Sequence, residues 1–142
     1  MIAPALREDP YALQKHLGFE ITDWQQGYAR VEMPIREVHG NRYRIPHGGV
    51  HATLIDTAMG FSGCYTGDPD NPQMAMTLSL TVNYLGQAKG ERLIVEARKT
   101  GGGRKVFFTE ALLSDEHGNP VASGVGTFRY RTGTKAPEES PK

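Results

Sequence analysis

The sequence predicts an α+β protein in which one sheet of about six strands packs against a single long helix. Only residues 47–65 carry apolar side chains at helical spacing over several turns. Most of the remaining chain falls into short runs, typical of strands, that are separated by glycine-rich breaks. A sheet and a lone helix each have an apolar face, and each can bury that face only against the other.

Length, charge and cysteine content narrow the class of protein. The chain has 142 residues, and we expect a single domain over residues 1–131. Because 16 basic and 16 acidic residues give a formal net charge of zero, binding to nucleic acid through bulk charge is not expected. The single cysteine, Cys64, fits a reducing compartment, and the sequence shows neither a signal peptide nor a run of about 18 apolar residues. These features predict a cytoplasmic protein that does not enter a membrane.

The N-terminal part is predicted to form a short helix and a pair of strands. Residues 6–17 are weakly amphipathic, which favours a helix. Residues 19–24 and 28–33 form two short runs separated by three residues that end in Gly27, as in a β-hairpin. Residues 35–46 are mixed charged and polar without a sustained period, so we expect a long loop, a feature that is often functional.

The long helix is predicted over residues 47–65, where Val50, Leu54, Ala58 and Phe61 recur at helical spacing. Glycine and alanine surround these positions, which suits a helix that other backbone approaches closely. Asp56 is the exception in this apolar stretch. Since burying an unpaired charge is costly, we expect Asp56 to have a partner or a chemical task.

Four further strands are predicted after the helix. Residues 76–84 alternate strictly, with Met, Leu, Leu, Val and Tyr on one face and Thr, Ser, Thr and Asn on the other. The next three strands are expected at residues 91–100, 105–114 and 120–131. Residues 132–142 contain prolines and several charges, and we expect a disordered tail there.

Residues 41–56 read NRYRIPHGGVHATLID. This segment resembles the hotdog-fold thioesterases of the 4-hydroxybenzoyl-CoA superfamily, particularly the phenylacetate-degradation type. Members have an Asn or Gln, then His-Gly-Gly six residues later, then an acidic residue nine beyond the His, and Asn41, His47 and Asp56 stand at these positions. The strand MTLSLTVNYL and the segment from Gly101 to Phe128 are also similar to family strands. The resemblance implies a hotdog fold, an antiparallel sheet wrapped around one central helix.

The resemblance further implies an acyl-CoA thioesterase that needs no metal or cofactor. The backbone N–H of Gly48, at the start of the helix, would polarise the thioester carbonyl, as free helix N-termini suit an oxyanion. Asp56 would act either as general base on water or as direct nucleophile. Thr77 would orient Asp56 or its water, Asn41 would help to fix the thioester or the water, and His47 would shape the helix start.

The distance between Gly48 and Asp56 bears on the assembly. Eight residues of helix span about 12 Å, too far for a donor and a carboxylate that must meet at one carbonyl. Two antiparallel helices related by a two-fold axis would bring Gly48 of one subunit to Asp56 of the other. Because the family builds its sites in this way, we expect a homo-oligomer, either a dimer or a dimer of dimers.

Substrate contacts are predicted at three places. Arg104 and Lys105, in the turn TGGGRK, are candidates for the phosphates of CoA. Gly49 is expected beside the carbonyl, and Met59, Phe61 and Tyr84 are expected to border the acyl pocket. Members of the family commonly have a glycine in the loop before His-Gly-Gly, where this chain has RYRI, so the acyl group itself is not predicted.

Other interpretations of these residues stay open. His47 and His51 are four residues apart, but the first lacks the following Glu of zinc hydrolases, so a metal site is disfavoured. Cys64 as a nucleophile is disfavoured as well, since small buried cysteines are common in cores. Structural roles compete for Asp56, Asn41, Thr77 and the pair Arg104–Lys105. At the level of function, a non-catalytic acyl-CoA-binding protein and a dehydratase or hydratase compete with the thioesterase.

Overall fold

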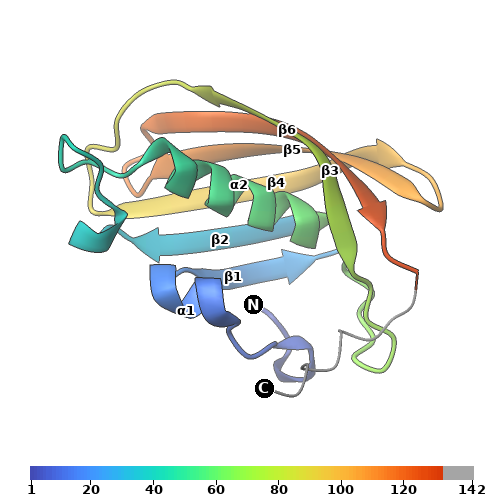
Figure 1. Ribbon diagram of the computed structural model, residues 1–142. Coiled ribbons are helices and arrows are strands. Elements are labelled where there is room, and N and C mark those ends of the chain that lie inside the picture. The colour runs from blue at the N-terminus through green and yellow to red at the C-terminus, as the bar shows by residue number, and fades with distance from the viewer. Residues whose placement is uncertain (133–142) are drawn as a thin grey trace, which may run out of the picture.

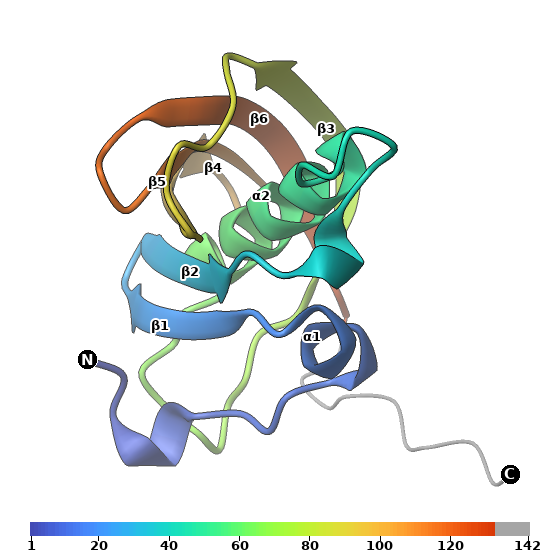
Figure 2. The same cartoon turned by 90° about the vertical axis from the view of Figure 1, so that its left-hand side faces the viewer.

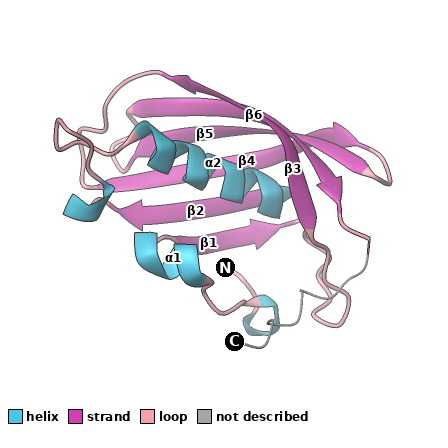
Figure 3. Cartoon of the chain, in the orientation of Figure 1, coloured by secondary structure: helices cyan, strands magenta, loops and turns pink. Residues whose placement is uncertain are grey.

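The computed structural model describes residues 1–132, so the predicted tail lies outside the described residues except for its first residue. Six antiparallel strands form one sheet in the order β1-β2-β4-β5-β6-β3 (Figure 1). Their bounds are β1 (Glu20–Gln25), β2 (Tyr28–Pro34), β3 (Ala75–Tyr84), β4 (Arg92–Gly102), β5 (Val106–Asp115) and β6 (Pro120–Tyr130). The helices are α1 (Ala12–Leu17) and α2 (Gly48–Ser62), with short 3₁₀ turns at Pro4–Leu6 and Glu37–His39 (Figure 3). The predicted fold class, an α+β sheet around one central helix, is confirmed.

The N-terminal helix is shorter than predicted. It begins at Ala12 rather than at Leu6, because a proline at position 10 disfavours helical backbone at the residue before it. Gly18 ends the helix in the left-handed conformation at φ 80°. The Arg36 guanidinium then donates to the exposed carbonyl of Leu17 at 2.8 Å, which ties the long loop to the end of α1. Residues 1–10 form an N-terminal arm that runs beneath β1 (Figure 2).

Helix α2 lies in the concave face of the sheet, which curves around it (Figures 1 and 2). Leu54, Ile55, Ala58 and Met59 are fully buried on the side of the helix that faces the strands. Two glycines of β6 make this close approach possible. A Cβ on Gly124 would lie 2.6 Å from Ile55, and one on Gly126 would lie 2.9 Å from the end of Met59. Within residues 1–132, no helix has the length and apolarity that crossing a membrane requires.

Strand β3 does not alternate strictly, because its pairing with β6 shifts between Thr77 and Ser79. Thr77 is opposite Phe128 and Leu80 is opposite Gly126, so both side chains face α2 although they are three residues apart. Strict alternation would have turned Thr77 to the outer face. The β-bulge at Leu78 therefore corrects the predicted pattern and brings Thr77 to the side of the helix.

Candidate active site

The start of α2 leaves one backbone donor free. The imidazole Nδ1 of His47 accepts from the N–H of Gly49 at 2.8 Å, and the carbonyl of His47 accepts from Val50 and His51. The N–H of Gly48 has no partner within residues 1–132. His47 thus caps the helix, and the occupied N–H of Gly49 is not available to a substrate. Gly48 is the donor left to an oxyanion, aided by the positive end of the helix dipole.

Tyr84 stands at the same end of the helix. Its hydroxyl donates to the carbonyl of Gly48 at 2.7 Å, and its ring would lie 3.2 Å from a Cβ at that position. Only a residue without a side chain fits here without a shift of the ring. Tyr84 therefore positions the backbone of Gly48, and it lies away from Asp56.

Asp56 and Thr77 form the second half of the candidate site. The hydroxyl of Thr77 donates to Asp56 Oδ1 at 2.7 Å, a short bond of the kind that carboxylates accept. Asp56 is half-buried, so its charge is not enclosed in the apolar core as the LIDTAMGF stretch suggested. One carboxylate oxygen is held by Thr77, and the other oxygen accepts no side-chain hydrogen bond within residues 1–132.

A cavity of about 230 Å³ opens beside this pair. Asp56, Thr57, Gly60, Phe61 and Cys64 of α2 and the following turn form one wall, and the start of β3 forms another. Aromatic side chains form much of the lining, and a few polar ones and a methionine complete it: Tyr11, Trp24, Phe61 and Phe128, with Glu8, Gln73 and Met74. An apolar or aromatic acyl group would be buried well in such a space.

One of the predicted pocket residues needs correction, and most of the lining residues were not predicted. Met59 has no exposed surface and belongs to the core, because it packs towards the glycines of β6. Tyr84 borders the helix start and does not line this cavity in the same copy, so its place at the acyl pocket stays a prediction. Tyr11 and Trp24 line the cavity although they lie more than thirty residues before Asp56 in the chain. No local pattern in the sequence links them to the site.

The hydrogen bonds that Asn41 makes are all to residues of its own loop. Its side-chain oxygen accepts from the N–H of Tyr43 at 2.8 Å, and its backbone N–H donates to the carbonyl of Ile45. The turn ends on Arg44, which adopts a left-handed φ of 61°. This conformation favours glycine, the residue that the family commonly has in this loop. Only the side-chain N–H₂ of Asn41 lacks a partner within residues 1–132.

Arg104 and Lys105 lie exposed in the turn between β4 and β5, beyond the C-terminal end of α2 (Figure 1). Neither side chain makes an ion pair within residues 1–132. The pair is thus nearer to Asp56 than to the start of the helix at Gly48. Its charges are free for a polyanionic ligand.

The histidines and the cysteine have surroundings that differ from those of catalytic groups. No cluster of three or more His, Cys, Asp or Glu side chains suited to a metal occurs within residues 1–132. His51 is buried, and neither ring nitrogen has a hydrogen-bond partner there. Burial raises the pKa of the Cys64 thiol to about 12, which leaves it protonated and weakly nucleophilic at neutral pH.

The predicted site residues therefore form two clusters that lie at different positions along α2. His47, Gly48 and Tyr84 meet at the N-terminal end of α2, whereas Asp56 and Thr77 meet eight residues further along. At about 1.5 Å per residue the separation along the helix is about 12 Å. A single copy presents two half-sites that do not touch one another.

Comparison with known proteins finds similar chains among esterases and thioesterases. Residues 44–122 match the family model described as "Thioesterase superfamily". A Halobacterium salinarum protein that carries the name of an esterase is 32% identical in an alignment of 129 positions that covers 85% of each chain. Human acyl-coenzyme A thioesterase 13 is 28% identical over 134 residues, covering 87% of this chain and 92% of the relative. A Bacillus halodurans protein solved with CoA superposes with a TM-score of 0.75 at 28% identity, covering 89% of this chain and 83% of that one.

Proposed function

Because the chain belongs to the thioesterase superfamily, we propose that it hydrolyses acyl-CoA thioesters to a free acid and CoA. The observation that carries this proposal is the Asp56–Thr77 hydrogen bond at the mouth of an aromatic cavity. A protein that only binds acyl-CoA has no need for an oriented carboxylate beside the acyl group. The acyl group enters the cavity, and its carbonyl carbon lies against Asp56.

Two routes use the same geometry. In one, Asp56 takes a proton from water while the water oxygen bonds to the carbonyl carbon, and the C–S bond then breaks to release the CoA thiolate. In the other, the Asp56 carboxylate attacks the carbonyl carbon itself, and the C–S bond breaks to release the CoA thiolate and leave a mixed anhydride. Water then hydrolyses this anhydride to the free acid and restores the Asp56 carboxylate. Thr77 holds the carboxylate in place in both routes.

Charge that develops on the carbonyl oxygen needs a donor, which we assign to Gly48 of a second copy. The half-sites lie too far apart along α2 for one copy to use both. Strand β3 supplies a surface for pairing, because it bonds only to β6 and leaves its other edge open. Leu78, at the bulge of this strand, is 56% exposed, and Met76 and Leu80 on its two faces are also exposed. A second strand paired with the open edge would cover part of this apolar surface. We propose a symmetric dimer through β3, with a site at each junction, and a dimer of dimers is compatible with it.

Arg104 and Lys105 are proposed to meet the phosphates of CoA. The pair is exposed, without ion-pair partners within residues 1–132, and nearer to Asp56 than to Gly48. The Bacillus halodurans relative solved with CoA supports CoA as the carrier of the acyl group.

Initial rates of CoA release from a panel of aryl- and alkyl-CoA thioesters test the function, with native protein and Asp56→Asn compared side by side. Asparagine keeps the shape and the oxygen that accepts from Thr77, but it can neither take a proton nor attack, so we expect turnover to fall about 10²–10⁴-fold. Asp68→Asn, an exposed aspartate in the loop after α2, is the matched control and should retain the native rate. No turnover of any thioester by the native protein, together with tight binding of acyl-CoA, would favour the non-catalytic alternative.

A further inference from the structure

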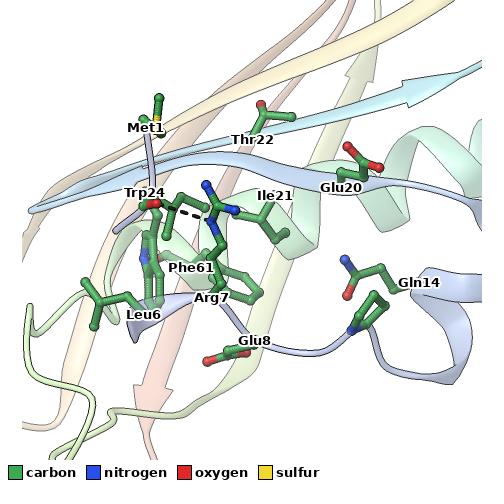
Figure 4. Close-up of a pocket in the computed structure, with 12 residues that line it drawn as sticks. Met1, Leu6, Arg7, Glu8, Gln14, Glu20, Ile21, Thr22, Trp24 and Phe61 are labelled. Carbon is green, nitrogen blue, oxygen red and sulfur yellow. Dashed lines mark hydrogen bonds between the residues drawn. The ribbon is translucent and has the colours of Figure 1, made fainter. Parts of the chain in front are cut away.

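A second cavity lies behind the aromatic wall of the first. It measures about 420 Å³ and lies between β1 and the N-terminal arm (Figure 4). Ile2 and Leu6 of the arm and Ile21 of β1 give it apolar surface, and its other lining includes polar and charged side chains: Arg7, Glu8, Gln14, Glu20 and Thr22. Trp24, Phe61 and Glu8 line this cavity and also the cavity beside Asp56. The two aromatic side chains, Trp24 and Phe61, form an aromatic partition between the two spaces, and Glu8 lies at its border.

The aromatic partition is held firmly. The rings of Trp24 and Phe61 meet edge to face with centroids 5.2 Å apart, and Figure 4 shows them side by side at the cavity. The indole N–H of Trp24 donates to the backbone carbonyl of Phe61 at 2.8 Å. The ring of Tyr65 makes a second edge-to-face contact with the indole, at a centroid distance of 5.5 Å. A side chain fixed at three contacts does not swing aside easily when a ligand arrives.

The position of the aromatic partition relative to Asp56 sets the depth of the first cavity. Phe61 follows Asp56 by five residues, a rise of about 7.5 Å along α2. An acyl group whose carbonyl lies at Asp56 therefore reaches the partition after a short chain or a single ring. A longer chain would have to displace an aromatic ring to enter the second cavity.

We propose that Trp24 and Phe61 set the acyl length that this protein accepts. The second cavity is then a continuation of the acyl site from which the aromatic partition excludes the acyl chain. The native protein then prefers aryl and short-chain acyl groups, which end at the partition. Opening the partition joins the cavities and lets long chains lie along Ile2, Leu6 and Ile21. This inference rests on the proposed thioesterase function for its substrate, and it adds residues that determine specificity.

The test is the kcat/KM profile over acetyl-, butyryl-, hexanoyl-, octanoyl-, decanoyl- and lauroyl-CoA for native protein and Phe61→Ala. The variant keeps the indole bond, because the acceptor is the backbone carbonyl of Phe61. Each methylene that reaches the second cavity should raise kcat/KM about fourfold, so that the optimum moves to the longer chains. Trp24→Leu opens the same partition from the other side and should give the same shift.

Two further variants distinguish an opened partition from a general loosening of the packing around Trp24. Tyr65→Leu removes an aromatic contact of Trp24 but lines neither cavity, and its profile should stay native. Leu6→Trp, combined with Phe61→Ala, fills the second cavity and should restore the preference for short chains. An unchanged profile in both folded opening variants, or an equal shift in Tyr65→Leu, would overturn the inference and leave the thioesterase proposal standing.

Affinity for S-alkyl-CoA thioethers, measured by calorimetry, tests the partition without catalysis. Phe61→Ala should bind S-dodecyl-CoA more tightly than native protein does, while affinity for S-butyl-CoA changes little. If the native protein hydrolyses no thioester, the proposed function fails. The ratio of the affinity for S-dodecyl-CoA to that for S-butyl-CoA still decides whether the aromatic partition limits chain length. The same ratio in the native protein and in Phe61→Ala would reject the partition.

Discussion

Gly48 combines two properties that a substitution can separate. Its N–H is free within residues 1–132, and its missing side chain makes room for the ring of Tyr84. Alanine adds a Cβ and keeps the N–H, whereas proline adds a comparable Cβ and removes the N–H. Proline suits this first helical position, because His47 before it is already extended at ψ 140°.

We therefore expect Gly48→Pro to lower kcat about 10²–10³-fold, the usual effect of losing one oxyanion donor. Gly48→Ala should lose much less, through the displaced Tyr84 alone. Steady-state kinetics of the two variants, with circular dichroism to check that both fold, gives the comparison. Equal losses in both would show that the packing on Tyr84 matters and the donor does not.

His51 is a polar side chain without a polar partner within residues 1–132, although it is buried. Burial, with a smaller contribution from the charge of His47, lowers the pKa of His51. The folded state therefore holds it neutral, while the unfolded chain takes up a proton below about pH 6.5. Stability linked to this group is complete above that pH and is lost as the pH falls.

His51→Leu removes the unsatisfied nitrogens and should raise the free energy of unfolding by about 1 kcal/mol at pH 7. The difference in the free energy of unfolding between the variant and the unsubstituted protein should increase as the pH is lowered from about 6.5 to 5. Only the unsubstituted protein has His51, so only it loses stability through this group. Urea unfolding at several pH values measures it. A less stable variant would mean that the imidazole has a partner in the assembled protein.

The contact between α2 and β6 depends on small residues in the strand. A Cβ on Gly124 would lie 2.6 Å from the branched end of Ile55, which cannot rotate away in a helix. We expect Gly124→Ala to lower the free energy of unfolding by about 1–3 kcal/mol through overpacking. Ser123→Ala, the next residue on the outer face, should change it by less than about 0.5 kcal/mol. Chemical denaturation of both variants tests the prediction, and equal stabilities would contradict it.

The bulge in β3 shows how one strand serves two purposes. On one side of the bulge, Thr77 faces α2 and bonds Asp56. On the other side, Leu80 and Tyr84 face the same way, and Tyr84 reaches the start of the helix. The same strand thus supports both half-sites, which lie about 12 Å apart along α2.

A dimer with shared sites predicts complementation between inactive variants. Gly48→Pro lacks the donor and Asp56→Asn lacks the carboxylate, so each should be inactive alone. When equal amounts are unfolded together and refolded, half of the dimers are mixed, and each mixed dimer has one intact site in two. We expect about a quarter of the native rate to return.

The recovered rate distinguishes the two assemblies directly. If each site used Gly48 and Asp56 of one copy, no mixture would hold an intact site and no activity would return. Sedimentation of the mixture confirms that it is oligomeric. Leu78→Lys places a charge on the exposed edge of β3, so it should weaken the dimer and lower activity together.

Much of the fold and part of the site could be predicted from local pattern. Helix α2 was predicted within three residues at each end, because its spacing and its His-Gly-Gly start are features of neighbouring residues. The strands were placed almost as well, since alternation and glycine breaks are local too. The separation of Gly48 from Asp56 also followed from the sequence, because helical rise is constant. N-terminal helix α1 was the main error in extent, through an interior proline.

Only the tertiary structure decided which side chains share a space. Thr77 faces α2 because β3 shifts its register against β6, a strand more than forty residues away. Met59 lies in the core and Trp24 lines the cavity because the sheet curves around the helix and brings β1 to its end. The sequence by itself determined the fold class, the central helix and the spacing of its reactive groups, since these depend on residues close in the chain. The bulge, the cavity and the aromatic partition arise from contacts between distant segments, which no local period encodes.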